Sequence, residues 1–218
     1  MLKLMARLLL RFVIPAMAVI AQAAVLPAPA YDIPAPAAKQ TATAVFAGGC
    51  FWGVEAVFER LKGVTGVVSG FVGGSKASAH YQIVSTGLTK HAESVKIAYD
   101  PALISFGQLL EVFFSVAHDP TELNRQGPDE GPQYRSAIFY TSDEQKRVAE
   151  AYIEQLTNQK IFRHRIVTQV VPFTGFYAAE AYHQRFFDRN PDNPYIVYND
   201  VPKVKRLRKE FPELLKAR

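Results

Sequence analysis

Residues 42–63 read ATAVFAGGCFWGVEAVFERLKG, a strand signal followed directly by a helix signal. The run over 42–47 is short, apolar and rich in β-formers, which predicts a strand. From Trp52 onward the apolar residues recur at helical spacing until Gly63 ends the run. The pattern therefore places Cys50 where a strand gives way to a helix.

Further strand and helix signals follow along the chain, without the regular alternation of a doubly wound sheet. We expect strands over 64–71, 92–99, 137–140 and 166–171, and helices over 106–117, 143–159 and 176–187. Residues 190–202 are rich in Pro, Asn and Tyr and are expected to form an ordered loop. Together these elements predict an α+β fold, a two-layer sandwich of helices packed on a mainly antiparallel or mixed sheet with a ferredoxin-like core.

The first 23 residues have the order of a secretory signal peptide. Three basic residues precede an apolar run over 12–20, and a small-x-small site follows at 21–23. We therefore expect a secreted or periplasmic protein from which residues 1–23 are cleaved. A retained membrane anchor is the alternative, but a spanning helix needs about 20 apolar residues, and Pro15 and Gln22 interrupt this run.

Residues 24–40 contain four prolines and no periodic apolar face, which predicts an extended linker. The compact part then spans residues 41–218, a length typical of a single catalytic domain. The formal charge of +5 falls to +2 without the three basic residues of the first segment. The basic run over 203–209 is typical of the solvated face of a terminal helix, so a nucleic-acid partner is not expected.

Cys50 is the only cysteine of the chain, which excludes an intramolecular disulfide. At a helix start its thiol meets unpaired backbone N–H groups and the positive end of the helix dipole, so we expect its pKa to lie below the ordinary value of about 8.5. Phe51 and Trp52 beside the sulfur form an apolar wall suited to a small apolar group. The alternative is an inert buried thiol, with Phe51 and Trp52 as core residues.

Glu93 follows His91 and Ala92 at the start of the alternating segment over 92–99. Its position has the parity of the apolar face of that strand. A carboxyl on this face loses solvation, which raises its pKa and keeps it protonated near neutrality, as a general acid requires. The alternative is that the start of the strand is solvated and Glu93 only caps the sheet.

A long polar stretch rich in Gly and Pro spans residues 118–136 between a helix and a strand. Loops of this length in a compact domain are usually functional or disordered, and donors and acceptors held by turns favour function. A metal site from His118, Asp119 and Asp129 is an alternative. The spacing matches no familiar ligand pattern, so an organic site is favoured.

Four motifs in order resemble those of the A-type peptide methionine sulfoxide reductases: GGCFWG at 48–53, HAE at 91–93, RQG followed by Asp129, and QYRS at 133–136. Tyr81 ahead of the second motif and YHQ at 182–184 also match. The likeness covers about residues 42–187, nearly the whole compact part.

The resemblance implies an enzyme that reduces methionine S-sulfoxide, protein-bound and free, and so repairs proteins after oxidative damage. Cys50 would attack the sulfoxide sulfur and Glu93 would protonate its oxygen, which leaves a sulfenic acid on Cys50. Phe51 and Trp52 would enclose the substrate methyl group. Hydrogen bonds to the oxygen, direct or through water, would come from Tyr81, Asp129 and Tyr134. No metal or organic cofactor is implied.

The chain departs from the family pattern in its thiols. Many relatives carry further cysteines near the C-terminus that form a disulfide, which thioredoxin then reduces. Residues 195–218 contain no thiol, and Ser85 stands where relatives often place a cysteine. Cys50 must therefore be reduced by an external thiol, either a small molecule or a thioredoxin- or glutaredoxin-like protein, through a mixed disulfide. A monomer is expected by default.

Two other functions fit fewer of these features. A thiol peroxidase that uses Cys50 needs no methyl pocket, which counts against it because of the adjacent aromatic pair. An exported binding module would use the surface of Phe51 and Trp52 with the basic tail, and Cys50 would be incidental.

Overall fold

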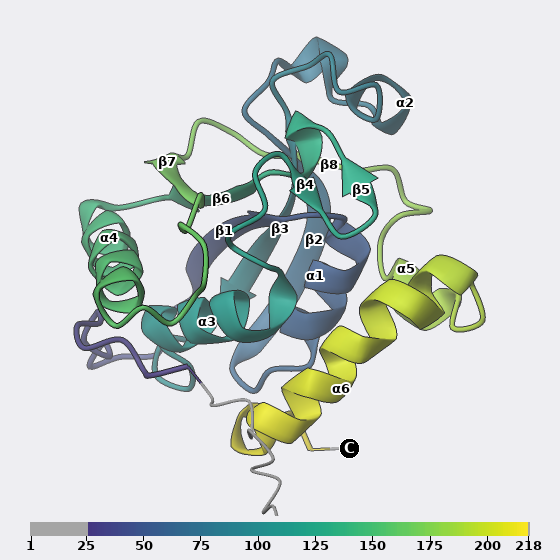
Figure 1. The fold of residues 1–218 in the computed structure, drawn as a ribbon. Coiled ribbons are helices and arrows are strands. Elements are labelled where there is room, and N and C mark those ends of the chain that lie inside the picture. The colour runs from purple at the N-terminus through teal and green to yellow at the C-terminus, as the bar shows by residue number, and fades with distance from the viewer. Residues whose placement is uncertain (1–25, 218) are drawn as a thin grey trace, which may run out of the picture.

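The computed structural model describes residues 26–217, which form a sheet of six strands with helices packed on it (Figure 1). The sheet strands are β1 (Ala42–Gly48), β2 (Val64–Val72), β3 (Ala92–Tyr99), β6 (Ser136–Tyr140), β7 (Gln169–Pro172) and β8 (Tyr177–Ala178). The helices are α1 (Phe51–Glu59), α2 (Tyr81–Val84), α3 (Phe106–Val112), α4 (Asp143–Asn158), α5 (Phe186–Arg189) and α6 (Val201–Glu210). A separate ribbon of β4 (Arg125–Gln126) and β5 (Asp129–Glu130) precedes β6. The predicted α+β fold is confirmed.

The strand order β7-β6-β1-β3-β2-β8 brings distant parts of the sequence together. The four central strands pair antiparallel, β8 adds antiparallel to β2, and β7 adds parallel to β6. α1 links β1 to β2, α3 links β3 to β6, and each pair encloses one other strand, which is the ferredoxin-like arrangement. Because β1 and β3 are antiparallel neighbours, the end of β1 lies beside the start of β3.

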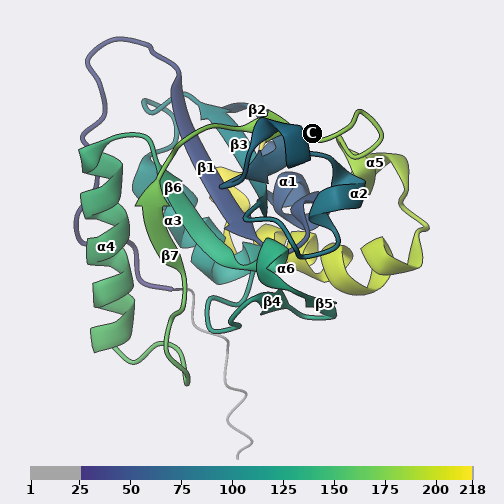
Figure 2. The ribbon, with the colours of Figure 1, turned by 90° about the horizontal axis from the view of Figure 1, so that it is seen from above.

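The helices cover one face of the sheet. α1 and α3 pack there, flanked by α6 and α4 (Figures 1 and 2). Phe46 of β1 joins these layers, with its ring centroid 5.5 Å from that of Phe58 and 4.8 Å from that of Phe113. The opposite face carries a smaller apolar cluster, against which Phe173 and Phe176 pack. β1 is therefore buried on both faces, which gives the site a rigid base.

Most of the predicted elements are confirmed. The segments over 64–71, 92–99 and 137–140 are strands, and 143–159 is a helix whose Ser142 side chain accepts from Gln145 N–H. The apolar run over 106–117 is α3 continued by a π-helical turn, Phe113–Ala117. β7 begins at Gln169, later than the expected start at 166.

The expected helix over 176–187 is wrong. Residues 177–178 form the edge strand β8, and helical structure begins only at Phe186. The Gln184 side chain accepts from Ser69 N–H and donates to Ser69 O of β2, at 2.9 Å each, and Arg185 has a left-handed φ of +52°. These bonds to the sheet take the place of helical backbone bonds, because the edge of β2 offers donors and acceptors that a local pattern does not reveal.

The expected loop over 190–202 is also wrong in part. A π-helical turn, Ile196–Asp200, runs directly into α6. Ile196 is fully buried, and Pro202 lies in the first turn of α6, where a missing N–H costs no helical bond. Burial of Ile196 thus outweighs the loop-like composition of this segment.

Residues 26–33 of the Pro/Ala segment are docked on the fold. Tyr152 of α4 donates to Pro27 O at 2.8 Å, and Asp32 Oδ1 accepts from Gly107 N–H at the start of α3 at 2.8 Å. Leu26 joins the main core. The predicted signal segment over 1–23 lies outside the described residues. Within residues 26–217, no helix has the length and apolar character needed to cross a bilayer.

Candidate active site

Cys50 lies at the amino end of α1, immediately after β1. The turn between the two elements needs Gly49, which has φ of +88°, and a Cβ there would lie 2.5 Å from the Gln126 side chain. The long loop therefore packs directly over the turn. Cys50 is only 7% exposed, so most of its surface is shielded from solvent.

Glu93 of β3 lies beside the first turn of α1. Its Oε2 accepts from the Phe51 N–H at 3.1 Å, and the residue is 1% exposed. Burial raises its pKa to about 8, against the opposing effect of the Phe51 hydrogen bond. Glu93 thus carries a proton at neutral pH, in agreement with the parity of its position in the strand. The alternative of a solvated residue at the sheet edge is wrong.

The expected lowering of the Cys50 pKa is wrong. Burial of the thiol raises its pKa well above the ordinary value, and the Glu93 and Asp200 carboxyls, which are ionised in the higher pH range where the thiol titrates, raise it further. The backbone N–H of Trp52 at the helix start acts in the opposite direction and does not outweigh these effects. The helix position was predicted correctly, but desolvation is a property of the whole fold and decides the sign.

The other predicted oxygen-binding residues, Tyr81, Asp129 and Tyr134, lie around the Glu93 carboxyl. Tyr81 begins α2, and Tyr134 ends a 3-10 turn, Pro132–Tyr134, just before β6. Burial raises the pKa of both phenols, that of Tyr81 to about 12, and the nearby charge of Glu93 is the next cause for each. Asp129 accepts a hydrogen bond from Tyr195, and its negative charge raises the Glu93 pKa. The structure therefore brings together all seven predicted site residues.

An aromatic box surrounds the Trp52 indole, and we define it as Phe51, Trp52, His183, Phe186 and Tyr195. Phe186 stacks on Trp52 with centroids 3.8 Å apart and planes 11° apart, and Tyr195 meets it edge-on at 5.7 Å. Trp52 Nε1 donates to His183 Nδ1 at 3.1 Å, and burial lowers the His183 pKa, so that the imidazole is neutral and able to accept. The His183 ring also lies 5.2 Å from that of Phe51.

Three members of the box were not predicted as site residues from the sequence. His183 appears there only as part of a matched motif, and Phe186 and Tyr195 were given no role. The available signal for these residues was their position in the sequence, since Phe186 follows the YHQ motif and Tyr195 follows an Asn-Pro pair. Their relation to Trp52 depends on the fold, because more than 130 positions separate them in the chain.

Asp200 was also missed, and it lies against the first turn of α1. A Cβ on Gly53 would lie 2.0 Å from Asp200 Oδ1, so only glycine permits this approach. Asp200 is fully buried and pairs with Lys203 Nζ at 3.3 Å. Burial raises the Asp200 pKa to about 6, with Lys203 opposing.

His118 has a structural role in the described fold. Its Nδ1 is 3.0 Å from Phe113 O, its Nε2 is 2.7 Å from Ser136 Oγ, and burial lowers its pKa to about 4. Asp119 is engaged with Thr121, whose backbone N–H donates to its carboxylate. Within residues 26–217 no group of three or more His, Cys, Asp or Glu side chains is placed to hold a metal ion.

Residues 42–215 match the family described as peptide methionine sulfoxide reductase. Peptide methionine sulfoxide reductase MsrA 2 of Synechocystis is 53% identical over 88% of this chain and 91% of its own length, and the protein of the same name from Mesorhizobium japonicum is 56% identical over 82% and 91%.

Two solved structures are similar as well. Reduced Mxr1 from Saccharomyces cerevisiae aligns with a TM-score of 0.63 and 32% identity, over 73% of this chain and 91% of that one. Methionine sulfoxide reductase A of Corynebacterium diphtheriae gives a TM-score of 0.60 and 36% identity, over 69% and 76%.

Proposed function

The chain belongs to the peptide methionine sulfoxide reductases, and we propose that it reduces methionine S-sulfoxide through a sulfenic acid on Cys50. The observation that carries this mechanism is the hydrogen bond of 3.1 Å between Glu93 Oε2 and the N–H of Phe51, the residue after Cys50. It holds a carboxyl that is protonated at neutral pH next to the reactive sulfur. A nucleophile and a general acid then share one enclosed site.

The first half-reaction needs only these two groups. The Cys50 sulfur bonds to the substrate sulfur while Glu93 donates its proton to the sulfoxide oxygen and recovers the thiol proton. The substrate S–O bond then breaks, the hydroxyl passes to the Cys50 sulfur, and the sulfur–sulfur bond opens to release methionine. The sulfoxide is reduced by two electrons, and the thiol is oxidised to a sulfenic acid.

The pocket gives this reaction its substrate preference. The methyl group on the substrate sulfur packs in the aromatic box against Phe51 and Trp52, where apolar surface is removed from water. The sulfoxide oxygen is oriented by Tyr81, Asp129 and Tyr134, directly or through water. Both phenols are neutral at physiological pH and are therefore able to donate to the oxygen.

Recycling requires an external thiol, because Cys50 is the only cysteine in the sequence. A first thiol RSH condenses with the sulfenic acid to give a Cys50–S–S–R mixed disulfide and water. A second thiol attacks the R sulfur, which restores Cys50 and releases a disulfide. We propose a thioredoxin- or glutaredoxin-like protein or a small-molecule thiol as this reductant, with oxidised proteins and free methionine sulfoxide as substrates.

The place of action is proposed from the first residues. The basic, apolar and small-residue order over 1–23 supports export by a cleaved signal peptide, with a retained anchor as the alternative. We propose a monomeric protein that repairs methionine outside the cytoplasm.

A single-turnover assay of residues 24–218 tests this proposal. The prereduced protein is mixed with excess methionine S-sulfoxide and no reductant, and methionine and the oxidation state of Cys50 are measured. We expect one equivalent of methionine and one sulfenic acid, trapped as an adduct, and neither from the Cys50→Ser variant. No methionine from folded, reduced protein would overturn the assignment, and turnover of peroxide alone would favour the peroxidase.

A further inference from the structure

The segment from Glu180 to Phe186 supplies two members of the aromatic box without forming a regular helix. His183 accepts from Trp52 Nε1, and Phe186 stacks on the Trp52 ring. Its own backbone is irregular, since Arg185 has φ of +52°. A segment of this kind keeps a fixed position only if contacts outside it hold its backbone.

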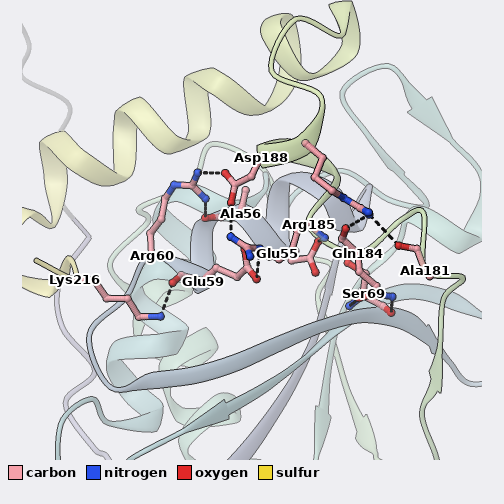
Figure 3. A network of polar contacts seen from close by, with 11 residues as sticks. Glu55, Ala56, Glu59, Arg60, Ser69, Ala181, Gln184, Arg185, Asp188 and Lys216 are labelled. Carbon is pink, nitrogen blue, oxygen red and sulfur yellow. Dashed lines mark hydrogen bonds and ion pairs between the residues drawn. The ribbon is translucent and has the colours of Figure 1, made fainter. Parts of the chain in front are cut away.

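Two anchors hold this segment, one at β2 and one at α1 (Figure 3). Gln184 is bound to β2, where its side chain accepts from Ser69 N–H and donates to Ser69 O. Glu55 reaches from α1, and its Oε2 accepts from the Arg185 N–H at 2.8 Å. The exposed ion pairs nearby, such as that between Arg185 and Asp188, contribute little by comparison.

Glu55 is unusual among these contacts because it is an acid in the core. It is 1% exposed, and burial together with the charge of Glu59 raises its pKa to about 7. Its Oε1 and the Ser69 Oγ are buried and have no hydrogen-bond partner among the described residues. The reaction proposed above makes no use of this carboxyl, so its retention in the core calls for another role.

We propose that Glu55 is a positioning residue, which holds the Arg185 backbone so that His183 and Phe186 fix the Trp52 indole in its substrate-binding orientation. This inference rests on the proposed role of Trp52 in binding the methyl group. Glu55 lies on the same helix as Trp52, so α1 carries both the side chain to be positioned and the residue that holds its support. Loss of the anchor then loosens the box without removing any reacting group.

The test compares Glu55→Leu with Glu55→Gln. Leucine fills the volume but leaves the Arg185 N–H without an acceptor, which is expected to raise KM for methionine S-sulfoxide about tenfold with kcat within about twofold of wild type. Glutamine keeps an oxygen for that N–H and offers its NH₂ to Ser69, so it is expected to restore the wild-type KM. Glu59→Gln is the matched control, since Glu59 pairs only with the Arg185 side chain, at 3.6 Å.

Tryptophan fluorescence reports a change in the surroundings of the Trp52 indole without turnover, because Trp52 is the only tryptophan. We expect an altered emission maximum and intensity in Glu55→Leu and wild-type emission in Glu55→Gln and Glu59→Gln. A folded Glu55→Leu with unchanged KM and emission overturns the proposal, as does a Glu55→Gln that behaves like Glu55→Leu.

Gln184→Ala covers the case in which Glu55→Leu does not fold. It removes the neighbouring anchor and is expected to raise KM and change the Trp52 emission in the same direction; an unchanged KM and emission in that folded variant overturns the proposal. Failure of the proposed function is distinguishable, because it would abolish methionine formation by the wild type and leave the fluorescence comparison intact.

Discussion

The two halves of the site are built in different ways. Cys50 and Glu93 sit on α1 and β3, whose backbones are fixed by the central sheet and by the apolar core. The outer wall comes from residues 180–200, which include short helical turns and are held by individual polar contacts. The contrast indicates that the proposed reacting groups belong to the part fixed by the sheet and core, and that the proposed binding wall depends on a few individual polar contacts.

Electrostatics differs between these halves as well. For Cys50 and Glu93, burial is the largest cause of the pKa shift, and it raises both pKa values. The outer wall presents His183, Phe186 and Tyr195 to Trp52, and burial lowers the pKa of His183, while the buried Asp200 at its end acts on Cys50. Changes on the first side should therefore alter the chemical step, and changes on the second side should alter substrate affinity. The following predictions test this division.

The largest effect is expected from Glu93→Gln. The amide still accepts from Phe51 N–H but has no acidic proton, so kcat should fall by about a hundredfold or more while KM changes little. Single-turnover methionine formation measures the loss. The exposed Glu130→Gln serves as the control, and an unchanged kcat in Glu93→Gln would remove Glu93 from the chemistry.

The pH dependence of the single-turnover rate should reflect the titration of the Glu93 carboxyl. The pKa of Glu93 is raised to about 8, so the acid is present below that pH and is lost above it. The single-turnover rate should fall about tenfold per pH unit above pH 8. Rates measured from pH 6 to 10 check this, and the falling limb must be absent from Glu93→Gln if the assignment is correct.

A smaller effect is expected from Phe186→Ala on the outer wall. Loss of the stacking contact with Trp52 at 3.8 Å should raise KM about fivefold and leave kcat nearly unchanged. Phe187→Ala is the matched control, since its ring lies under the Arg60 guanidinium at 4.8 Å. A fall in kcat at constant KM would contradict the division between the halves.

The smallest effect is expected far from both halves, at Asp32. Asp32→Ala removes the acceptor for Gly107 N–H and should lower the free energy of unfolding by about 1 kcal/mol, with kcat and KM unchanged. Urea titration measures this change. Equal stability of variant and wild type would mean that the hydrogen bond between Gly107 N–H and Asp32 contributes nothing to the free energy of unfolding.

The sequence predicted the half of the site that depends on local pattern. The change from a strand pattern to a helix pattern places Cys50 at the start of α1. The alternation over 92–99 places Glu93 on a buried face. The same reasoning gave the wrong structure for residues 176–187, because the Gln184 side chain bonds to the Ser69 backbone and the Arg185 N–H bonds to the Glu55 carboxylate. Hydrogen bonds between groups distant in the sequence produce no periodic pattern of apolar residues.

By itself the sequence determined the α+β class and the places of Cys50 and Glu93 in the elements, since these follow from periodicity, and it excluded an intramolecular disulfide, since that follows from a count of cysteines. Only the tertiary structure decided the direction of the Cys50 pKa and the composition of the aromatic box. Desolvation depends on everything packed around a group, and a pocket wall depends on which distant segments meet. Both are sums over three-dimensional neighbours, which chain order does not specify.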